Sequence, residues 1–203
     1  MPDKRSRRDR CSRDRAMRAS APGQSALLMM DVAATLRSEG IPYVVIGAMA
    51  AAVHGSVRAS LDADALVSVT IADAKSLQGR FSTEGLTSEL RIGDADDPIP
   101  ALLAISDGFG NRVDLLIGLR GMDPAAFARA RHVTFFGESL SIVGREDFIA
   151  MKIFAGGPQD LADARQAMGF DRAALDLDLL QRLAARFGPE TSSNLAKLLR
   201  DEG

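Results

Sequence analysis

The chain has 203 residues, 46% of them hydrophobic, and a formal net charge of −2. This length and apolar content suffice for one compact domain, with or without a helical extension, and the charge gives no general signal for polyanion binding. The single cysteine, Cys11, excludes an internal disulfide. Because the sequence has neither an apolar run of membrane-spanning length nor the hydrophobic core of a secretory signal, we expect a cytoplasmic protein with no membrane partner.

The first 24 residues alternate arginine with serine and aspartate and contain almost no large apolar side chains. A segment of this composition cannot bury enough apolar surface to fold, so we expect a disordered basic tail over residues 1–24. Two interpretations stay open. The tail is either solvated and without function, or it is an arm that contacts RNA phosphates.

Residues 25–143 mix strand-like and helix-like segments. Helical spacing predicts helices at residues 25–39 and 71–81, after Gly47, and after an N-cap at Asp123. Short β-branched runs predict strands at residues 43–46, 61–69, 98–106, 112–117, 133–136 and 140–143. The glycine-containing segment 107–111 predicts a hairpin that makes its two flanking strands antiparallel neighbours, and the polar segment 83–97 is expected to be irregular.

From Gly144 onward the pattern changes to helices. These are predicted at residues 145–155, 160–168, 171–186 and 189–200. The predicted fold class is therefore α/β (α+β), with a small mixed sheet and helices over residues 25–143 and a helical C-terminal region over residues 144–203.

Two carboxylates interrupt the predicted strand at residues 61–69. Because side chains alternate across a strand, Asp62 and Asp64 leave the same face. Such close like charges are tolerated when a hard divalent cation and a neighbouring anion, such as a nucleotide phosphate, complete the oxygen shell. Asp114 interrupts a second strand in the same way. If the two strands are neighbours, the three carboxylates converge on one or two Mg²⁺ ions, as phosphoryl or nucleotidyl transfer requires.

The turn at Gly47 supplies a second part of such a site. Glycine permits a sharp bend, and the N–H groups of Ala48 and the residues after it can bind the phosphates of a triphosphate at the start of a helix. Arg58 lies in the loop before the paired aspartates. It either contacts the nucleotide phosphates or the acceptor, or it neutralises the acidic cluster.

The acidic residues also have a structural interpretation. In that reading Asp62 and Asp64 are hydrogen-bonded turn or edge-strand acids, and Asp114 is an ion-pair partner of Arg112 or Arg58. The two histidines, His54 and His132, are interpreted as structural.

Further along the chain, Lys152 lies in an apolar helix and either extends to water or points at a phosphate. Asp160 and Asp163 are either an N-cap and a first-turn acid of the next helix, or one of them points at the catalytic centre.

The order Gly47-Ala48, Asp62-Ala63-Asp64 and Asp114 resembles the signature of the DNA polymerase β-like nucleotidyltransferase superfamily. The stretch of residues 144–163, GREDFIAMKIFAGGPQDLAD, is similar to the lysine-containing helix and acidic motif of its AbiEii-type group. Members of that group include toxins of toxin–antitoxin pairs. The likeness covers residues 43–168.

This resemblance implies an enzyme that transfers a nucleoside monophosphate from an NTP, such as ATP, to a hydroxyl on the 3′ end of a tRNA or on a protein. It implies that two Mg²⁺ ions are held by three carboxylates and that phosphates are bound by the glycine turn and by basic residues. It also raises the possibility of a cognate antitoxin as partner. The implied residues are Asp62, Asp64 and Asp114 for the metal and Gly47, Ala48, Arg58, Lys152 and Asp160 for the nucleotide.

The sequence departs from the resembled group at two positions. Ala48 stands where relatives have serine or glycine, and Gly157 stands where they tend to have arginine. These departures support an alternative hypothesis, a catalytically degenerate protein that binds nucleotide or acts through a partner.

Overall fold

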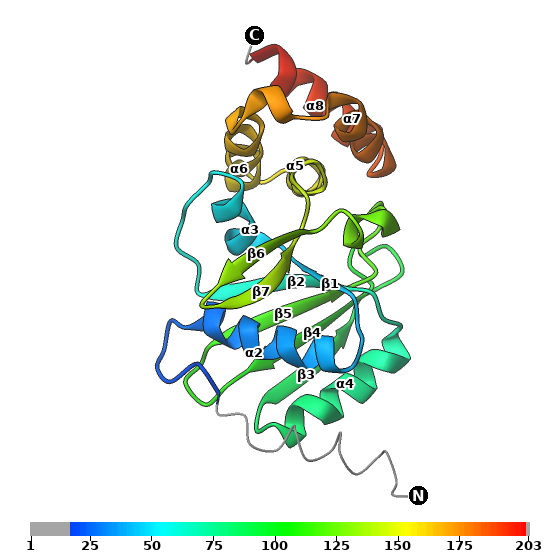
Figure 1. Cartoon of the computed structure of the whole chain (residues 1–203). Coiled ribbons are helices and arrows are strands. Elements are labelled where there is room, and N and C mark those ends of the chain that lie inside the picture. Colours follow the sequence, from blue (N-terminus) through cyan, green and yellow to red (C-terminus); the bar gives the residue numbers. More distant parts are fainter. Residues whose placement is uncertain (1–16, 202–203) are drawn as a thin grey trace, which may run out of the picture.

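The structure is a computed structural model that describes residues 17–201 (Figure 1). Its centre is a mixed seven-stranded sheet with the strand order β3-β4-β5-β2-β1-β7-β6. The predicted α/β (α+β) class, with a mixed sheet followed by helices, is confirmed. The predicted disorder of residues 1–16 lies outside the described part of the chain.

The elements follow the sequence as predicted, with two exceptions described below. The strands are β1 (Tyr43–Val45), β2 (Asp62–Val67), β3 (Thr87–Ile92), β4 (Ala101–Ser106), β5 (Arg112–Ile117), β6 (Arg131–Phe135) and β7 (Glu138–Ile142). The helices are α2 (Ser25–Ser38), α3 (Gly47–Val53), α4 (Ile71–Thr83), α5 (Arg145–Ala155), α6 (Pro158–Gly169), α7 (Leu177–Arg186) and α8 (Pro189–Asp201), with short 3₁₀ turns η1 (Pro124–Phe127) and η2 (Arg172–Ala174).

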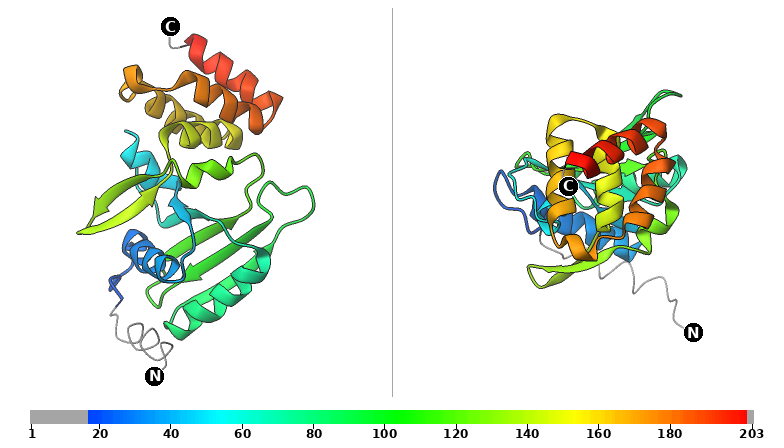
Figure 2. Two further views of the ribbon diagram at one scale, coloured as in Figure 1. Left: turned by 45° about the vertical axis from the view of Figure 1, so that its right-hand side comes forward. Right: turned by 90° about the horizontal axis from the view of Figure 1, so that it is seen from above.

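Helices cover the sheet from two sides. α2 packs on β2 and β5, and α4 packs on β3 and β4. α3 contacts β2, and the C-terminal helices α5 to α8 pack on one another beyond it (Figure 2). In Figure 1, α2 and α4 lie on one side of the sheet, and α3 with the C-terminal helices lies on the other.

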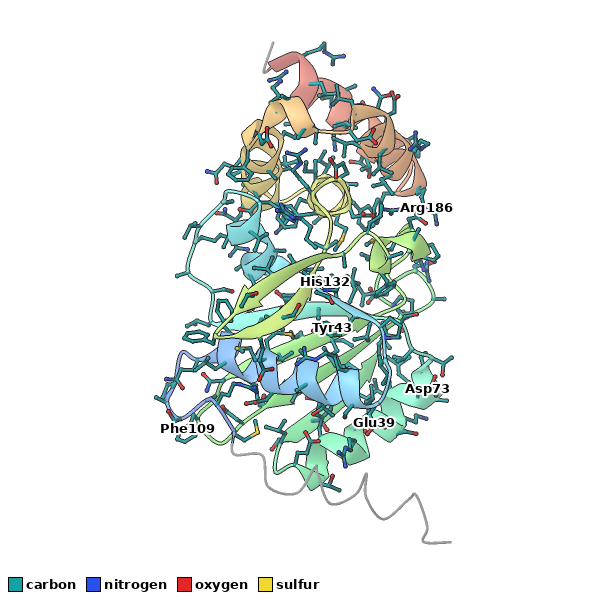
Figure 3. The ribbon with its side chains drawn as sticks, viewed as in Figure 1. Glu39, Tyr43, Asp73, Phe109, His132 and Arg186 are labelled. Carbon is teal, nitrogen blue, oxygen red and sulfur yellow. The ribbon has the colours of Figure 1, made fainter. Side chains whose placement is uncertain are left out.

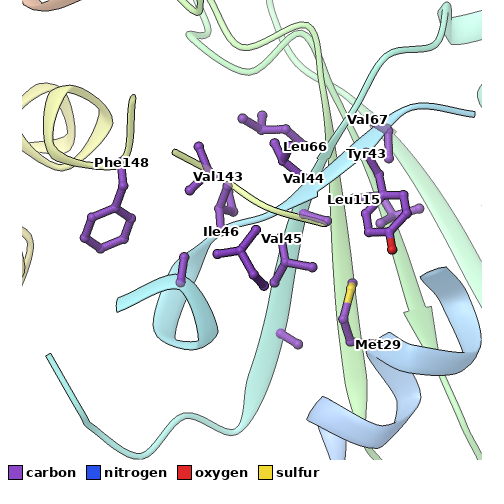
Figure 4. Packing of buried hydrophobic residues seen from close by; sticks show 14 of the residues in the cluster. Met29, Tyr43, Val44, Val45, Ile46, Leu66, Val67, Leu115, Val143 and Phe148 are labelled. Carbon is purple, nitrogen blue, oxygen red and sulfur yellow. The ribbon is translucent and has the colours of Figure 1, made fainter. Parts of the chain in front are cut away.

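The core is the interface between the sheet and these helices (Figure 4). Val44, Val45 and Leu115 from the central strands are fully buried, as is Met29 from α2. Phe148 of α5 is buried as well, so the C-terminal helices share the same hydrophobic cluster with the sheet. Burial of this apolar surface is the main source of the stability that holds the candidate site in place.

The register of the central strands positions the functional residues. β2 pairs in parallel with β5, so that Asp64 lies directly opposite Asp114. β4 and β5 form the predicted antiparallel hairpin, with Asp107 in its turn accepting from the N–H of Asn111 at 3.0 Å. Side chains directly opposite on one face of a sheet lie about 5 Å apart, so this register brings distant parts of the sequence together.

The structure corrects two predictions about secondary structure. The segment 83–97, expected to be irregular, contains the edge strand β3. The predicted helix at residues 171–186 is broken. Asp171 has a left-handed backbone with φ 50°, η2 follows, and α7 begins only after the N-cap Asp176, whose side chain accepts from the N–H of Leu179.

The expected disordered tail also ends earlier than predicted. Ala19 is buried, and the Arg18 side chain bonds to Asp31 of α2 and to Glu138 of β7. The start of the described chain is therefore attached to the core through Arg18 and Ala19, whereas Ser20, Pro22 and Gly23 are exposed. Among the described helices, none combines the length and the apolar character that crossing a bilayer would need.

Candidate active site

Three carboxylates gather at one end of β2 and β5. Asp62, Asp64 and Asp114 each offer an oxygen atom, and these oxygens lie within 4.8 Å of one another. Period-two alternation places Asp62 and Asp64 on one face of β2, and the parallel register adds Asp114 from the neighbouring strand. Asp62 is exposed and the other two are partly exposed, so the cluster, here called the acidic triad, is open to solvent ions.

The charges of the triad are only partly compensated within the protein. Burial, followed by the negative charges of Asp62 and Asp114, raises the pKa of Asp64 to about 6. The positive charges of Lys152 and Arg58 oppose this increase in the pKa. A cluster of oxygen donors with excess negative charge fits a hard divalent cation such as Mg²⁺.

Gly47 faces the triad from the end of β1. Its φ of 60° is in the left-handed region that favours glycine, and a Cβ atom there would overlap Oδ2 of Asp64. The Ile46 N–H donates to the backbone oxygen of Asp64 at 2.9 Å, which fixes the turn against β2. Glycine at position 47 therefore allows the Asp64 carboxylate to lie directly against the turn, where any larger residue would collide with it. Ala48 follows as the second residue of the short helix α3 and is buried.

Asp114 has an ion-pair partner of its own. Arg112, two residues earlier on the same face of β5, donates from Nε to Oδ1 at 2.7 Å and from Nη2 to Oδ2 at 2.9 Å. The ion pair with Arg112 named in the structural interpretation is therefore present. It coexists with the gathering of the three carboxylates, because each carboxylate oxygen accepts more than one bond.

Lys152 is held by two aspartates of α6. Its Nζ lies 2.7 Å from Oδ1 of Asp160 and 3.1 Å from Oδ2 of Asp163, and its side chain is largely buried. Lys152 therefore does not extend freely to water. Asp160 is not an N-cap, because Gly157 holds that position.

The predicted N-cap at Asp123 is present at the start of η1, where its side chain accepts from the N–H of Ala125.

Asp163 is the centre of this polar cluster. It is fully buried and accepts from Ser56 Oγ at 2.8 Å, Arg58 Nε at 3.3 Å and Gln159 Nε2 at 3.1 Å, in addition to Lys152. Burial alone would raise the pKa of Asp163, but the hydrogen bonds from Ser56, Lys152 and Gln159 lower it below its usual range. The Asp163 carboxylate thus contacts both of the cations, Lys152 and Arg58, that act on Asp64.

Sequence reasoning missed the contribution of Ser56 and Gln159. Ser56 lies two residues before Arg58, and Gln159 lies four residues before Asp163 on one face of α6. The helical spacing of Gln159 is a weak signal. The meeting of the loop after α3 with α6 depends on tertiary packing and leaves no trace in the local sequence.

The histidines have no place in the acidic triad. His54 is fully buried at the end of α3, its Nε2 lies 2.9 Å from the carbonyl oxygen of Val143, and its ring packs against Phe148. Burial lowers the pKa of His54. His132 is exposed on β6 (Figure 3). Neither histidine belongs to the group of carboxylates that could hold a metal ion.

Two open cavities of about 620 and 420 Å³ lie elsewhere on the described surface. Glu39 and Asp73, labelled in Figure 3, belong to the larger one, between the end of α2 and α4. None of the candidate site residues lines either cavity, and Asp73 is engaged in the capping box of α4. The chemistry of the acidic triad, and not cavity size, therefore identifies the candidate site.

No family model matches the sequence, and no curated protein matches it either. Solved structures do match the fold. An antigenic nucleotidyltransferase-like protein from Paracoccidioides brasiliensis aligns with a TM-score of 0.52 and 14% identity, over 90% of this chain and 95% of that one. ANT(2″)-Ia in complex with adenylyl-2″-tobramycin aligns with a TM-score of 0.53 and 13% identity, over 79% and 94%.

A third structure, that of the putative nucleotidyltransferase TM1012 from Thermotoga maritima, aligns with a TM-score of 0.52 and 13% identity, over 76% of this chain and 99% of that one. The fold is that of the nucleotidyltransferases. At 13–14% identity the likeness concerns the fold alone and does not assign a role to any single residue of this chain.

Proposed function

We propose that the protein is a metal-dependent nucleotidyltransferase that transfers a nucleoside monophosphate from an NTP to a hydroxyl acceptor and releases pyrophosphate. The observation that carries this proposal is the acidic triad, whose oxygens lie within 4.8 Å of one another beside a glycine whose missing Cβ lets the Asp64 carboxylate lie against the turn. The shared fold of three nucleotidyltransferase-type structures supports it.

In this proposal Asp62 and Asp64 would hold two Mg²⁺ ions together with the triphosphate, and Asp114 would complete the ligand set on the acceptor side. When bound, Mg²⁺ supplies Lewis-acid stabilisation of the charge on the transferred phosphoryl group and its leaving oxygens. Asp114 also accepts the proton of the attacking hydroxyl. The acceptor oxygen then forms the new bond to the α-phosphorus as the bond to pyrophosphate breaks.

The nucleotide phosphates lie, in this proposal, against the backbone N–H groups of Gly47 and Ala48. Lys152 and Arg58 neutralise phosphate charge, and Asp160 orients the Lys152 ammonium through the contact at 2.7 Å. The positive charges of both residues oppose the increase in the pKa of Asp64, which supports the proposal that they act on a phosphate bound beside the triad.

The acceptor and biological role belong to the same proposal. The acceptors that fit best are the 3′ end of a tRNA or a protein hydroxyl, and a small-molecule hydroxyl is the third kind. The likeness of residues 144–163 to the AbiEii-type group supports a toxin that acts with a cognate antitoxin.

A second candidate function is a degenerate nucleotidyltransferase that binds nucleotide or acts through a partner. Ala48, Gly157 and the engagement of both Asp114 oxygens by Arg112 favour it. In that case the protein would bind an NTP without forming product.

Incubation of purified protein with Mg²⁺, α-labelled NTPs and total tRNA separates the two candidates. Label transferred to RNA, protein or a small hydroxyl compound, and lost in Asp62→Ala or Asp64→Ala, is the expected result. Nucleotide binding without transfer to any of these acceptors would contradict the enzyme and support the second candidate.

A further inference from the structure

Arg112 belongs to the same group of side chains as the acidic triad. β2 and β5 pair in parallel, with Asp62 directly opposite Arg112. The next pair on this face is Asp64 and Asp114. Because side chains alternate along each strand, all four residues leave the same face of the sheet. A guanidinium group is therefore built into the cluster that the three carboxylates form.

The three carboxylates have different partners. Both oxygens of Asp114 accept from Arg112, at 2.7 and 2.9 Å. Asp62 accepts from a neutral hydroxyl, Ser60 Oγ, at 2.7 Å. The pKa of Asp64 is raised by burial and by its two acidic neighbours, so the more distant cations do not compensate its charge. In the described part of the chain, direct contact between the triad and a cation is therefore confined to Asp114.

A divalent cation on Asp114 would compete with this guanidinium. Mg²⁺ binds carboxylate oxygens at about 2.1 Å, so an ion on either Asp114 oxygen would lie no farther than about 5 Å from the nitrogen that donates to that oxygen. Like charges at such a distance repel. The guanidinium and an ion on the acceptor side therefore weaken each other's binding.

Arg112 is fixed by its backbone, whereas its side chain reaches solvent. Its N–H donates to Ser25 Oγ at 3.0 Å, which ties the start of β5 to α2. Its side chain is 39% exposed, compared with 14% for Asp114, so the guanidinium can rotate away without a change in the strand. The hydrogen bonds and the charge of Asp114 raise the pKa of Arg112, so this cation is not lost by deprotonation.

We propose that Arg112 takes the place of the acceptor-side metal ion in the free protein, so that the free protein binds one divalent cation, on Asp62 and Asp64. This inference rests on the proposed function, because it concerns the same metal ligands. A bound triphosphate offers the guanidinium another anion, so Arg112 releases Asp114 when nucleotide is present. Arg112 is thus a positioning residue that makes completion of the ligand set depend on the nucleotide.

Mn²⁺ binding to the nucleotide-free protein tests this inference without any measurement of activity. Electron paramagnetic resonance counts the bound ions, because Mn²⁺ loses the signal of the free hydrated ion when it binds. Arg112→Gln removes both the charge and the paired donors, whereas Arg112→Lys keeps the charge and loses the planar pair of donors.

Arg91→Gln is the matched control. Arg91 lies on the edge strand β3 and makes the same kind of pair with a carboxylate two residues away, Glu89, at 3.0 and 2.8 Å. Its loss changes the net charge equally but leaves Asp114 paired. The control therefore separates a general effect of charge from competition at Asp114.

We expect the unchanged protein and Arg91→Gln to bind one Mn²⁺ per chain at concentrations that fill the first site. Arg112→Gln should bind a second ion at least about tenfold more tightly than the unchanged protein does, with a smaller gain in Arg112→Lys. Adding Asp114→Asn to Arg112→Gln should abolish the gain. Two equally tight ions in the unchanged protein, or equal gains in Arg112→Gln and Arg91→Gln, would overturn the inference.

The transfer assay keeps this inference distinct from the proposed function. If the unchanged, nucleotide-free protein binds two ions equally tightly and also transfers label, the inference is wrong and the nucleotidyltransferase stands. If Arg112→Gln gains the second ion but the unchanged protein transfers no label to any acceptor, Arg112 controls metal occupancy and the proposed catalysis is wrong. If neither the unchanged protein nor any variant binds Mn²⁺, both are wrong.

Discussion

At the level of single residues, Asp64 determines the electrostatics of the candidate site. Its carboxylate is confined between two like charges, with Gly47 against its Oδ2 atom. The raised pKa of about 6 means that ionising Asp64 in the metal-free fold costs free energy. A bound cation would remove this cost, so the same residue links metal binding to the stability of the fold.

This cost predicts a pH-dependent effect of Asp64→Asn. The unfolded chain ionises Asp64 near 3.8 and the fold near 6, so the folded state holds more protons in this window and loses stability as the pH rises through it. Without metal, the melting temperature of the variant should match that of the unchanged protein near pH 4 and exceed it by a few °C at pH 7. A difference that is the same at both pH values would contradict the assignment.

The buried Asp163 predicts a second effect, on nucleotide affinity. Asp163→Asn keeps the shape but removes the charge that holds Lys152 and Arg58, so we expect the KM for NTP to rise at least about tenfold. Asp147→Asn is the matched control. Asp147 is equally buried and is paired with Arg129 at 2.7 and 2.9 Å, outside the proposed site.

Both variants should lose stability, by about 1–3 kcal/mol, because each replaces a buried carboxylate that accepts charge-assisted hydrogen bonds with a neutral amide. Only Asp163→Asn should change the KM. Equal kinetic effects of the two substitutions would mean that Asp163 acts on stability alone.

The sequence predicted correctly which side chains share a face of one strand, because that follows from the alternation of side chains along the strand. Period-two alternation predicted that Asp62 and Asp64 share a face, and the same rule places Arg112 beside Asp114. It could not predict that Asp163 bonds to Ser56, since that contact spans more than a hundred residues and depends on how α6 packs against the loop after α3.

At the level of elements, strands with two covered faces were easier to predict than the edge strand. β3 has the sequence TSELRI, in which Ser88, Leu90 and Ile92 share the face that α4 covers, and Ile92 at the end of the strand is exposed. One face is open, so its composition is polar and resembles a loop. The break before α7 was missed because Asp171 adopts a left-handed backbone, which local helix-forming composition does not reveal.

The turn between β1 and α3 gives a prediction at this scale. Gly47→Ala adds a Cβ atom against Asp64, whereas Gly40→Ala has a similar backbone, φ 70° instead of 60°, with no atom within 4 Å. Both substitutions should cost about 1 kcal/mol of stability from the left-handed backbone. Only Gly47→Ala should abolish nucleotide binding, as measured by calorimetry with an unreactive NTP analogue. Equal binding by both variants would show that the space beside Gly47 is not used.

At the level of the whole molecule, the site depends on the packing of the C-terminal helices against the sheet. The triad comes from β2 and β5, whereas Lys152 comes from α5 and its two partners come from α6. The sequence predicted both groups of elements and the fold class. Their relative placement is set by long-range contacts such as the ion pair of Arg129 with Asp147, which no periodic pattern encodes.

A crystal structure with Mn²⁺ and an unreactive NTP analogue tests the proposed chemistry most directly, because the anomalous signal locates the metal without reference to activity. The expected result is an anomalous peak coordinated by Asp62, Asp64 and Asp114, with the triphosphate against Gly47. A metal bound elsewhere, or a nucleotide that does not contact the acidic triad, would contradict the proposed nucleotidyltransferase.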